Sequence, residues 1–514
     1  MAQITYRANL NAATFPFLAE DFGRSVIVPG QDNNFNRQVT SKEDSDKDIG
    51  IPQVYYMHNV MPFAQGLQSV GYKQIVEGVH TGFLDVFALR DDTGVGFNSF
   101  MGVSYDGTTS SKILWILSGG IWTSTSTAMP DKKITYAHLQ GKTYIYIESV
   151  GCLRWDFATS AFVSVTMTGL DTSKILGITY AAGYMIAWDS TSIYWSSTLP
   201  ISGDVVDFAP SIVTGAGSQS LEAARGKITV CLPHQMGFIA YTSQNAIVHM
   251  FTSNSLYPFS ARELVSSGGL SDAEVVGSDS ASSSHYAYTT SGLQSISVSA
   301  TTVVFPEVTD FISGRRFEDY NASSYSFVQY DLAVAMKKRL TVVASRYLVI
   351  SYGMQSLTHA LVYDMALKRW GKLKIAHVSC FEYEVPNELV SDIPKQSIAF
   401  LQDSGNVYTV DFASASAATD SCLILGKYQY VRSRTLQLDE VVLENVRKNN
   451  AFELTDLISL GGKDFYPASG YLSEIGEQAR KYLFRSVGVN HSLQFSRSFR
   501  LVSLLLVFNI HGKR

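Results

Sequence analysis

The stretch Ala360-Leu361-Val362-Tyr363-Asp364-Met365-Ala366 ends a short apolar segment with an Asp between two apolar residues, followed by Ala. The same ending recurs in Trp155-Asp156-Phe157-Ala158 and in Val410-Asp411-Phe412-Ala413. Asp411 lies 47 residues after Asp364, and Asp364 lies 208 residues after Asp156, which we interpret as about five steps of roughly 42 residues. Short strands that repeat every ~40–47 residues are typical of β-propeller blades.

The repeated Asp has a local structural role in this interpretation. Its carboxylate can accept a hydrogen bond from the backbone N–H two residues further on and so fix the turn between the outer strands of a blade. We prefer this role to a catalytic one because the three Asp residues occupy equivalent turn positions.

Hairpins account for most of the chain between these repeats. Short strands rich in aromatic and β-branched residues, such as 142–148, 237–241 and 347–352, are each followed by a turn of Gly, Ser, Asn or Asp and then by a second strand. Helical periodicity is scarce. We therefore predict an all-β fold, with a β-propeller of about six or seven blades over residues 79–425.

Two flanking regions differ from the repeats. Residues 1–78 are polar and irregular, and we predict an extended N-terminal arm and lead-in segment, of which residues 1–75 would be ordered by neighbouring subunits. Residues 427–514 hold 13 Lys and Arg against eight Asp and Glu, so this end is locally basic. We predict a small β-rich platform domain over residues 426–514, packed on the propeller.

The composition of the 514-residue chain excludes several classes of protein. Charged residues make up 17% of the chain and aromatic residues 12%, which argues against disorder, coiled coils and long helical repeats. The apolar run 504–508 is far shorter than the roughly 20 residues of a membrane-spanning helix. A net charge of −5 excludes global attraction to nucleic acid.

The cysteines and the first residues indicate where the protein is made. The N-terminus lacks the basic start and apolar core of a signal peptide, so we expect no secretion. The cysteines are far apart and form no CxxC pair, so we expect buried thiols made in a reducing cytosol. They are Cys152, Cys231, Cys380 and Cys422.

No pattern predicts catalysis, a cofactor or a metal. Asp44, Asp46 and Asp48 alternate as in calcium loops, but Gly50 falls one residue late and Tyr55 replaces the closing Glu, so we interpret a solvated loop. The ten His form no HExxH or His-x-His pair. We assign no catalytic, cofactor-binding or metal residues and predict that the protein is not an enzyme.

Two further patterns have simple structural interpretations. Ser104-Tyr105-Asp106-Gly107-Thr108 is a fragment of the Asp-box of sialidase-like propellers, but Trp115 lies too far downstream and the pattern does not recur. Basic residues occur in dispersed pairs, which are normally solvated turn residues or interface residues rather than a DNA groove. The basic groups are Arg315-Arg316, Lys337-Lys338-Arg339, Lys368-Arg369, Arg432 with Arg434, and Arg447-Lys448.

Two stretches resemble a known family. Val54 to Tyr72, which contains Asn59-Val60-Met61-Pro62 followed by Gly66-Leu67, is similar to the N-terminal segment of the tail hub or nozzle proteins of short-tailed bacteriophages, the packaged-DNA stabilisation proteins. Ala360 to Trp370 resembles a strand, a turn and a Trp from their late blades. The order of arm, propeller and basic β-rich end is also similar.

The resemblance implies a structural protein of the virion tail, assembled in the host cytoplasm. In that family six copies form a ring below the portal–adaptor assembly, with tail fibre, spike or needle proteins nearby. The ring retains the packaged genomic DNA and lets it pass at ejection, without sequence specificity. A net-negative chain with few charges suits a conduit that does not bind DNA tightly.

Two other functions remain open from the sequence. A carbohydrate-binding or glycan-hydrolysing β-propeller would carry converging carboxylates and exposed aromatic residues on the propeller axis. A cytosolic protein-interaction propeller would associate with a host complex instead of a virion.

Overall fold

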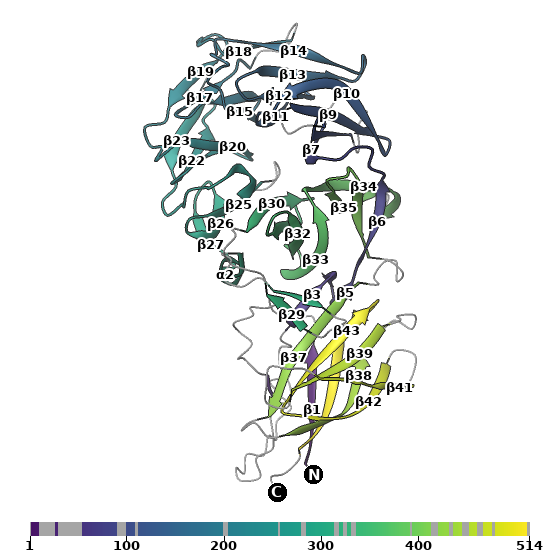
Figure 1. Cartoon of the computed structure of the whole chain (residues 1–514). Coiled ribbons are helices and arrows are strands. Elements are labelled where there is room, and N and C mark those ends of the chain that lie inside the picture. The colour runs from purple at the N-terminus through teal and green to yellow at the C-terminus, as the bar shows by residue number, and fades with distance from the viewer. Residues whose placement is uncertain are drawn as a thin grey trace.

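The structure is a computed structural model of the whole chain, shown in Figure 1. It describes residues 2–9, 26–28, 54–89, 99–107, 111–198, 204–254, 257–278, 284–312, 318–321, 326–329, 336–390, 393–412, 420–430, 435–444, 452–459, 466–474 and 479–510. Within them a β-propeller lies at one end of the molecule and a two-sheet β-sandwich at the other.

The first three blades of the propeller are consecutive antiparallel sheets. Blade 1 consists of β7 (Phe83–Ala88), β8 (Phe100–Tyr105), β9 (Ser111–Ser118) and β10 (Ile121–Pro130). Blade 2 consists of β11 (Ile134–Leu139), β12 (Lys142–Ile147), β13 (Gly151–Asp156) and β14 (Ala161–Thr168), with β18 (Val205–Asp207) added in parallel to β14. Blade 3 consists of β15 (Gly177–Ala181), β16 (Tyr184–Trp188), β17 (Ser192–Trp195) and β19 (Gly217–Ser220).

The next three blades follow the same order. Blade 4 consists of β20 (Ile228–His234), β21 (Gly237–Thr242), β22 (Ala246–Phe251) and β23 (Phe259–Glu263). Blade 5 follows the 3₁₀ turn η3 (Ala273–Val275) and consists of β24 (Val276–Gly277), β25 (Ser284–Thr289), β26 (Gly292–Ser297) and β27 (Thr301–Val303). After helix α2 (Pro306–Ile312) and the hairpin β28 (Glu318–Asn321) and β29 (Ser326–Gln329), blade 6 consists of β30 (Lys337–Val343), β31 (Tyr347–Gly353), β32 (Leu357–Asp364) and β33 (Arg369–His377).

The last blade is completed by a strand from the N-terminal part of the chain. Blade 7 consists of β34 (Ser379–Val390), β35 (Ile393–Leu401) and β36 (Val407–Asp411), followed in the sheet by β6 (Gly71–Val76). Tyr72 of β6 lies opposite Val410 of β36. Trp122 of blade 1 also donates a hydrogen bond to the Gly405 carbonyl at 2.8 Å. The circle of blades is therefore closed by contacts between segments more than 280 residues apart in the sequence.

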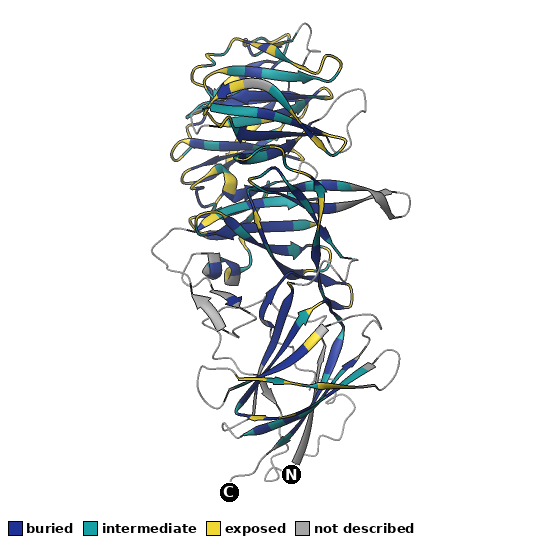
Figure 2. Ribbon diagram, turned by 45° about the vertical axis from the view of Figure 1, so that its right-hand side comes forward, coloured by how far each residue is buried: buried dark blue, intermediate teal, exposed yellow. Residues whose placement is uncertain are grey.

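The second strands of the blades form the core of the propeller. All six residues of β21 are buried, and so are Thr143 to Ile147 of β12. A strand covered by a neighbouring blade on each face has no solvent side, so both sets of alternating side chains must be compatible with burial. Figure 2 shows this burial through the middle of the blades, with exposed residues mainly at the turns.

The sandwich combines strands from both ends of the chain. One sheet has the order β1 (Ala2–Asn9), β45 (Ser503–Ile510), β38 (Leu436–Glu444), β42 (Ala479–Gly488) and β41 (Tyr471–Glu474). The other has the order β2 (Val26–Val28), β37 (Cys422–Tyr430), β43 (Asn490–Arg497), β39 (Phe452–Ser459) and β40 (Tyr466–Ser469), and β3 (Val54–His58) pairs with β37. Leu438, Leu493, Phe495, Leu506 and Phe508 are completely buried between them.

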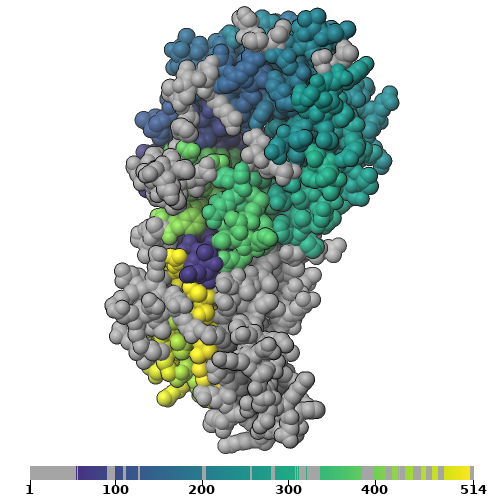
Figure 3. All heavy atoms as spheres, turned by 180° about the vertical axis from the view of Figure 1, so that it is seen from behind, coloured from purple at the N-terminus to yellow at the C-terminus, as the bar shows by residue number. Residues whose placement is uncertain are grey.

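Blade 6 extends directly into the region next to the sandwich. Its outer strand β33 pairs with β4 (Val60–Phe63), β4 pairs with β5 (Gly66–Ser69), and β5 pairs with β44 (Arg500–Leu501), which makes a seven-stranded sheet. Seen from behind, residues of the N-terminal segment lie between blade 6 and the C-terminal strands (Figure 3). We call this region, residues 54–76 with the segments that they contact, the junction.

The all-β propeller with a C-terminal β domain is confirmed, and its seven blades fall within the predicted range. The predicted step count was wrong. Asp156 lies in blade 2 and Asp364 in blade 6, so four steps separate them rather than five. The inner strands begin at residues 83, 134, 177, 228, 276, 337 and 379, and insertions such as β18 and the α2–β29 segment lengthen the steps.

The segment boundaries also differ from those predicted at residues 78 and 426. β6, predicted to precede the propeller, is the outer strand of blade 7, and β37 of the sandwich begins at Cys422. Residues 54–70, predicted as part of an extended arm, contribute strands to the sandwich and to the blade 6 sheet. Most of the remaining arm lies outside the described residues. No helix among the described residues is long and apolar enough to cross a membrane.

Candidate functional site

Charged and polar side chains from three blades meet where the inner strands begin. Arg339 on β30 contacts Asp85 on β7, with 2.5 Å between Nη2 and Oδ1, and donates a second hydrogen bond to the Val378 carbonyl at 3.2 Å. Ser379, the first residue of β34, donates to the same Asp85 oxygen at 2.9 Å. These bonds join blades 1, 6 and 7 around the axis.

Lys133 brings blade 2 to the same axial region. Its Nζ donates a hydrogen bond to the Thr229 carbonyl of blade 4 at 3.3 Å. Burial lowers the pKa of Lys133, although Asp272, Glu148 and Glu274 oppose this by their negative charge. Glu274 also acts on Arg339, whose pKa is raised because Asp85 and Glu274 outweigh the effect of burial. We call Asp85, Lys133, Glu274 and Arg339 the axial cluster. It mixes acidic and basic groups and therefore does not form a basic surface for nucleic acid.

Aromatic side chains line neighbouring inner strands. Phe87 of β7 stacks on Tyr136 of β11, with 4.6 Å between the ring centroids and 9° between the ring planes. Tyr136 also lies 5.4 Å from the His138 ring, which lies 6.1 Å from Tyr180 of β15. Tyr136 is 42% exposed, whereas Phe87 is buried, so Tyr136 is the ring of this row that faces solvent. An exposed aromatic ring can stack against a sugar or another planar group.

Asn59 is the centre of the junction. It lies between β3 and β4 in the left-handed region, with φ at 52°, and is almost completely buried. Its Oδ1 accepts hydrogen bonds from the Tyr72 hydroxyl at 2.6 Å and from the Lys374 backbone N–H at 2.8 Å. Its Nδ2 donates to the Asp420 carbonyl at 2.6 Å. One side chain thus connects blade 6, blade 7 and the segment that enters the sandwich.

Buried cationic and aromatic groups surround this asparagine. Lys372 is completely buried, and its Nζ lies 4.4 Å from the centroid of the Tyr56 ring. Such cation–π contacts are strongest where water is excluded. His58 lies 3.5 Å from the Asp420 carboxylate, yet burial dominates and lowers the pKa of His58. The junction therefore has a packed interior around Lys372, Tyr56 and His58, whereas the Asp420 side chain lies at its solvent-exposed edge.

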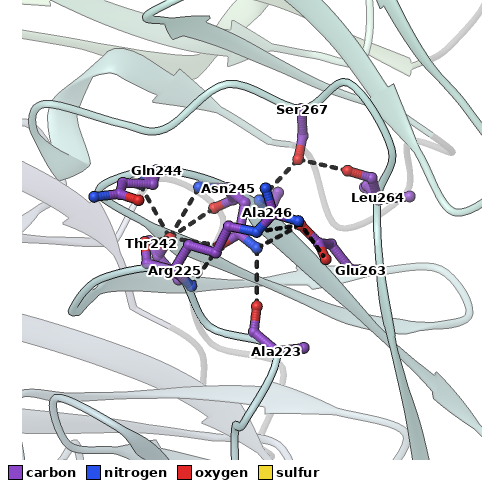
Figure 4. Close-up of polar contacts among 9 residues, drawn as sticks. All are labelled: Ala223, Arg225, Thr242, Gln244, Asn245, Ala246, Glu263, Leu264 and Ser267. Atoms are coloured by element: carbon purple, nitrogen blue, oxygen red, sulfur yellow. Dashed lines mark hydrogen bonds and ion pairs between the residues drawn. The ribbon is translucent and has the colours of Figure 1, made fainter.

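The turn between β21 and β22 holds a dense polar network, drawn in Figure 4. The Thr242 hydroxyl accepts hydrogen bonds from the backbone N–H groups of Gln244 and Asn245 at 3.1 and 2.9 Å. Asn245 donates to Glu263 at 3.0 Å, and Arg225 forms an ion pair with Glu263 at 3.2 Å. These contacts fix the turn of blade 4 to its outer strand, so we assign them a structural role.

The three repeated Asp residues lie at matching positions, each at the end of the third strand of a blade. The predicted turn bond is confirmed for two of them: Asp156 accepts from the N–H of Ala158 at 3.1 Å and Asp364 from the N–H of Ala366 at 3.0 Å. Asp364 also pairs with Arg346 at 2.7 Å. Asp411 ends β36, which is followed in the sheet by β6 rather than by the next segment of the chain.

Other residues singled out in the sequence are placed as follows. Ser104 accepts a hydrogen bond from the indole of Trp115 at 2.8 Å, so the Asp-box fragment and the distant Trp do meet, across strands β8 and β9. All four cysteines are buried free thiols, and burial raises the pKa of Cys152 to about 12. No group of three or more His, Cys, Asp or Glu able to hold a metal occurs among the described residues.

Some predicted features fall outside the described residues. They are Asp44, Asp46 and Asp48 with the rest of that acidic loop, Arg315-Arg316, Arg432, Arg434 and Arg447-Lys448. Within the described chain, Arg339 of the basic run on β30 belongs to the axial cluster, and Arg369 belongs to the junction.

Sequence reasoning missed Asn59 and Asp85 as key residues. Most of their partners lie hundreds of residues away, and no local spacing indicates such pairs. A weak signal existed for Asn59, because Asn is one of the few non-glycine residues that readily adopt the left-handed conformation.

Comparisons with known proteins find similar solved structures but no matching sequence family. No protein-family model and no curated protein matches the chain. Similar solved structures include YCF48 from Cyanidioschyzon merolae, at 13% identity over 66% of this chain and 98% of that chain, with a TM-score of 0.37. U3-55K has 6% identity over 66% of this chain and 98% of that chain, with a TM-score of 0.38.

The extracellular domain of the hybrid two component system BT4673 from B. thetaiotaomicron has 9% identity over 92% of this chain and 63% of that chain, with a TM-score of 0.38. Similarities of this size carry no argument about function. The seven blades, each built on four antiparallel strands, establish this chain as a β-propeller protein with an additional β-sandwich.

Proposed function

We propose that the chain is a structural subunit of the tail of a short-tailed bacteriophage, a hub or nozzle protein. In this proposal several copies, six by the resemblance, form a ring below the portal–adaptor proteins, near the fibre, spike or needle proteins. The ring retains packaged DNA and conducts it at ejection, and the chain performs no catalysis. It acts in the virion tail after assembly in the host cytoplasm.

One observation carries the proposal. The two stretches that resemble the family, 54–72 and 360–370, lie about 300 residues apart in the sequence but contact each other at the junction. Arg369 donates hydrogen bonds to the carbonyls of Gly66, at 3.3 Å, and Phe63. A Cβ on Gly371 would lie 2.5 Å from Met61 Sδ. Two independent sequence resemblances therefore belong to one structural feature, which supports an architecture shared with the tail hub or nozzle proteins.

The charges of the molecule are compatible with this role. A ring that DNA must pass through needs weak contacts with phosphates, and the net charge of −5 gives no general attraction. In the axial cluster, Arg339 forms an ion pair with Asp85, and Lys133 donates a hydrogen bond to the Thr229 carbonyl.

Assembly of the purified chain tests the proposal. We expect mass photometry and negative-stain microscopy to show closed rings, alone or after addition of the portal–adaptor complex. A variant with Arg369→Ala should assemble poorly, whereas Arg262→Ala, at an exposed position in blade 4, should assemble normally. A chain that stays monomeric in both conditions would contradict the proposal.

The alternative of a carbohydrate-binding or glycan-hydrolysing propeller is favoured by the aromatic row. Tyr136 is exposed near the axis, and carboxylates such as Glu274 belong to the same propeller. Binding on a glycan array, or glycan hydrolysis, that is lost in Tyr136→Ala and kept in Tyr257→Ala would support this alternative. Tyr257 is the matched control because it is an exposed tyrosine on blade 4, outside the row.

A further inference from the structure

A buried histidine connects the two sheets of the sandwich. His491 on β43 and Asp456 on β39 belong to one sheet, and both are completely buried. Nδ1 of His491 lies 2.8 Å from Oδ2 of Asp456, and Nε2 lies 3.1 Å from the Leu436 carbonyl on β38 of the other sheet. Ser486 on β42, also in the other sheet, donates a hydrogen bond to Oδ2 of Asp456.

The geometry fixes the number of protons in this cluster. A carbonyl and a carboxylate are acceptors, so each ring nitrogen of His491 must face its partner with a hydrogen between them. A neutral imidazole has one N–H and can satisfy only one of the two contacts. The cluster is therefore complete with two protons on the ring, as an imidazolium beside a carboxylate.

The surroundings leave Asp456 as the charged partner of His491. Phe508 of β45 lies 5.5 Å from the imidazole, and Tyr428 of β37 is the neighbouring titratable side chain, opposite His491 in the strand register. On the same strands, Lys481 is paired with Glu440 and Arg497 with Glu453, Asp439 is hydrogen-bonded to Gln437 and Asn509, and Arg485 is exposed. Oδ1 of Asp456 has no hydrogen-bond partner among the described residues.

We propose that His491 and Asp456 form a proton-dependent clasp, a hydrogen-bonded contact between the two sheets. The contact holds while the imidazole ring of His491 carries both protons and is lost when the imidazole loses one. On loss of the Nε2 proton, a lone pair of the imidazole faces the Leu436 carbonyl, and the contact between the sheets becomes repulsive. This inference does not depend on the proposed tail function. It concerns the domain in which strands from both ends of the chain meet.

The sign of the pH dependence follows from the environment. Burial lowers the pKa of His491, but the charge of Asp456 and the hydrogen bonds outweigh it, so the pKa lies above its ordinary value of 6.5. A raised pKa in the folded state means that the stabilisation is complete below pH 6.5 and disappears as pH rises through the folded pKa. The sandwich should therefore loosen as pH rises through the folded pKa of His491, above 6.5.

Hydrogen exchange of the full chain, corrected for the intrinsic effect of pH, tests the clasp. As pH rises from 6 through the pH at which His491 loses its proton, peptides covering 436–444 and 490–497 should lose protection, by about tenfold for each unit that separates the folded and unfolded pKa values. In His491→Gln the same peptides should show low protection that no longer changes with pH. In His285→Gln the sandwich peptides should behave as in the unaltered chain.

His285 is a suitable control because it is equally buried but lies in the propeller. Its ring contacts the Tyr241 hydroxyl, which can accept or donate, and the Pro233 carbonyl, each at 2.9 Å, so one ring proton suffices. Burial lowers the pKa of His285 to about 3.

NMR of the unaltered chain with labelled histidine keeps the test valid if His491→Gln does not fold. Both ring nitrogens of His491 should carry protons at pH 6, and the ring should titrate above pH 6.5. A neutral His491 at pH 6, or protection of the sandwich peptides that does not change as the ring titrates, would overturn the proposal.

Discussion

At the scale of single residues, the structure depends on buried polar side chains that each make several hydrogen bonds. Asn59 makes three hydrogen bonds at the junction, and Asp364 accepts bonds from two backbone N–H groups as well as from Arg346. Removing one partner of a buried hydrogen bond leaves the other unsatisfied, which costs more than the bond itself contributes. These residues therefore give direct tests of the structure.

Replacement of Asn59 should destabilise the chain strongly. Asn59→Gly retains the left-handed backbone and removes three hydrogen bonds, so we expect a loss of about 2–4 kcal/mol in the free energy of unfolding. Asn59→Ala should lose about 1 kcal/mol more because it adds backbone strain. Urea denaturation measures both. Ser160, with φ at 50° on an exposed turn, is the control, and Ser160→Ala should change stability by less than about 0.5 kcal/mol.

The turn residues Asp364 and Asp156 should differ in how much they contribute to the free energy of unfolding. Asp364 is 1% exposed, accepts hydrogen bonds from two backbone N–H groups and also pairs with the half-exposed Arg346, so Asp364→Ala should cost about 3 kcal/mol. Asp156 has one turn bond at a more exposed site, so Asp156→Ala should cost about 1 kcal/mol. Denaturation of the two variants side by side checks the order. Equal effects would contradict the assigned roles.

At the scale of elements, the critical feature is the strand that completes blade 7. β6 comes from the N-terminal segment and holds the last blade next to the first. Gly78 follows this strand, donates a backbone hydrogen bond to Asn406 at 2.8 Å, and lies so close to the turn of blade 7 that a Cβ would be 2.0 Å from the Ser404 carbonyl oxygen. The closure therefore depends on a glycine at this position.

Gly78→Ala should weaken the closure of the propeller. The added methyl group must push β6 away from the turn after β35, which we expect to cost about 1–3 kcal/mol. Limited proteolysis at increasing urea should cleave this variant earlier than the unaltered chain. The neighbouring Val79 is more than half exposed, so Val79→Ala should behave like the unaltered chain. Similar resistance of both variants would argue against a role for Gly78 in closure.

The sequence was sufficient to predict the strands and turns but not the pairing of strands that lie far apart in the chain. Apolar hairpins and the turn bonds of Asp156 and Asp364 depend on neighbours within a few residues, and these predictions are confirmed. The pairing of β6 with β36 joins residues more than 300 positions apart, and its strand pattern is the same as that of any other outer strand. The His491–Asp456 pair likewise has no local signature, because it depends on strand register in the folded sandwich.

At the scale of the whole molecule, both ends of the described chain meet in the sandwich and the middle forms the propeller. The junction between them is made by the two stretches that carry the family resemblance. If the propellers lie outside a ring and the sandwiches build it, the junction sets the angle between these layers. Variants of Asn59 and Arg369 should then affect ring assembly more than variants of equal stability in the blades.

The most direct test of the tail proposal is to locate the chain in virions that contain it. We predict that a low-resolution electron microscopy reconstruction of labelled particles will place the chain in a ring on the tail axis, below the portal. Absence of the label from virions, or a position away from the tail axis, would contradict the proposal.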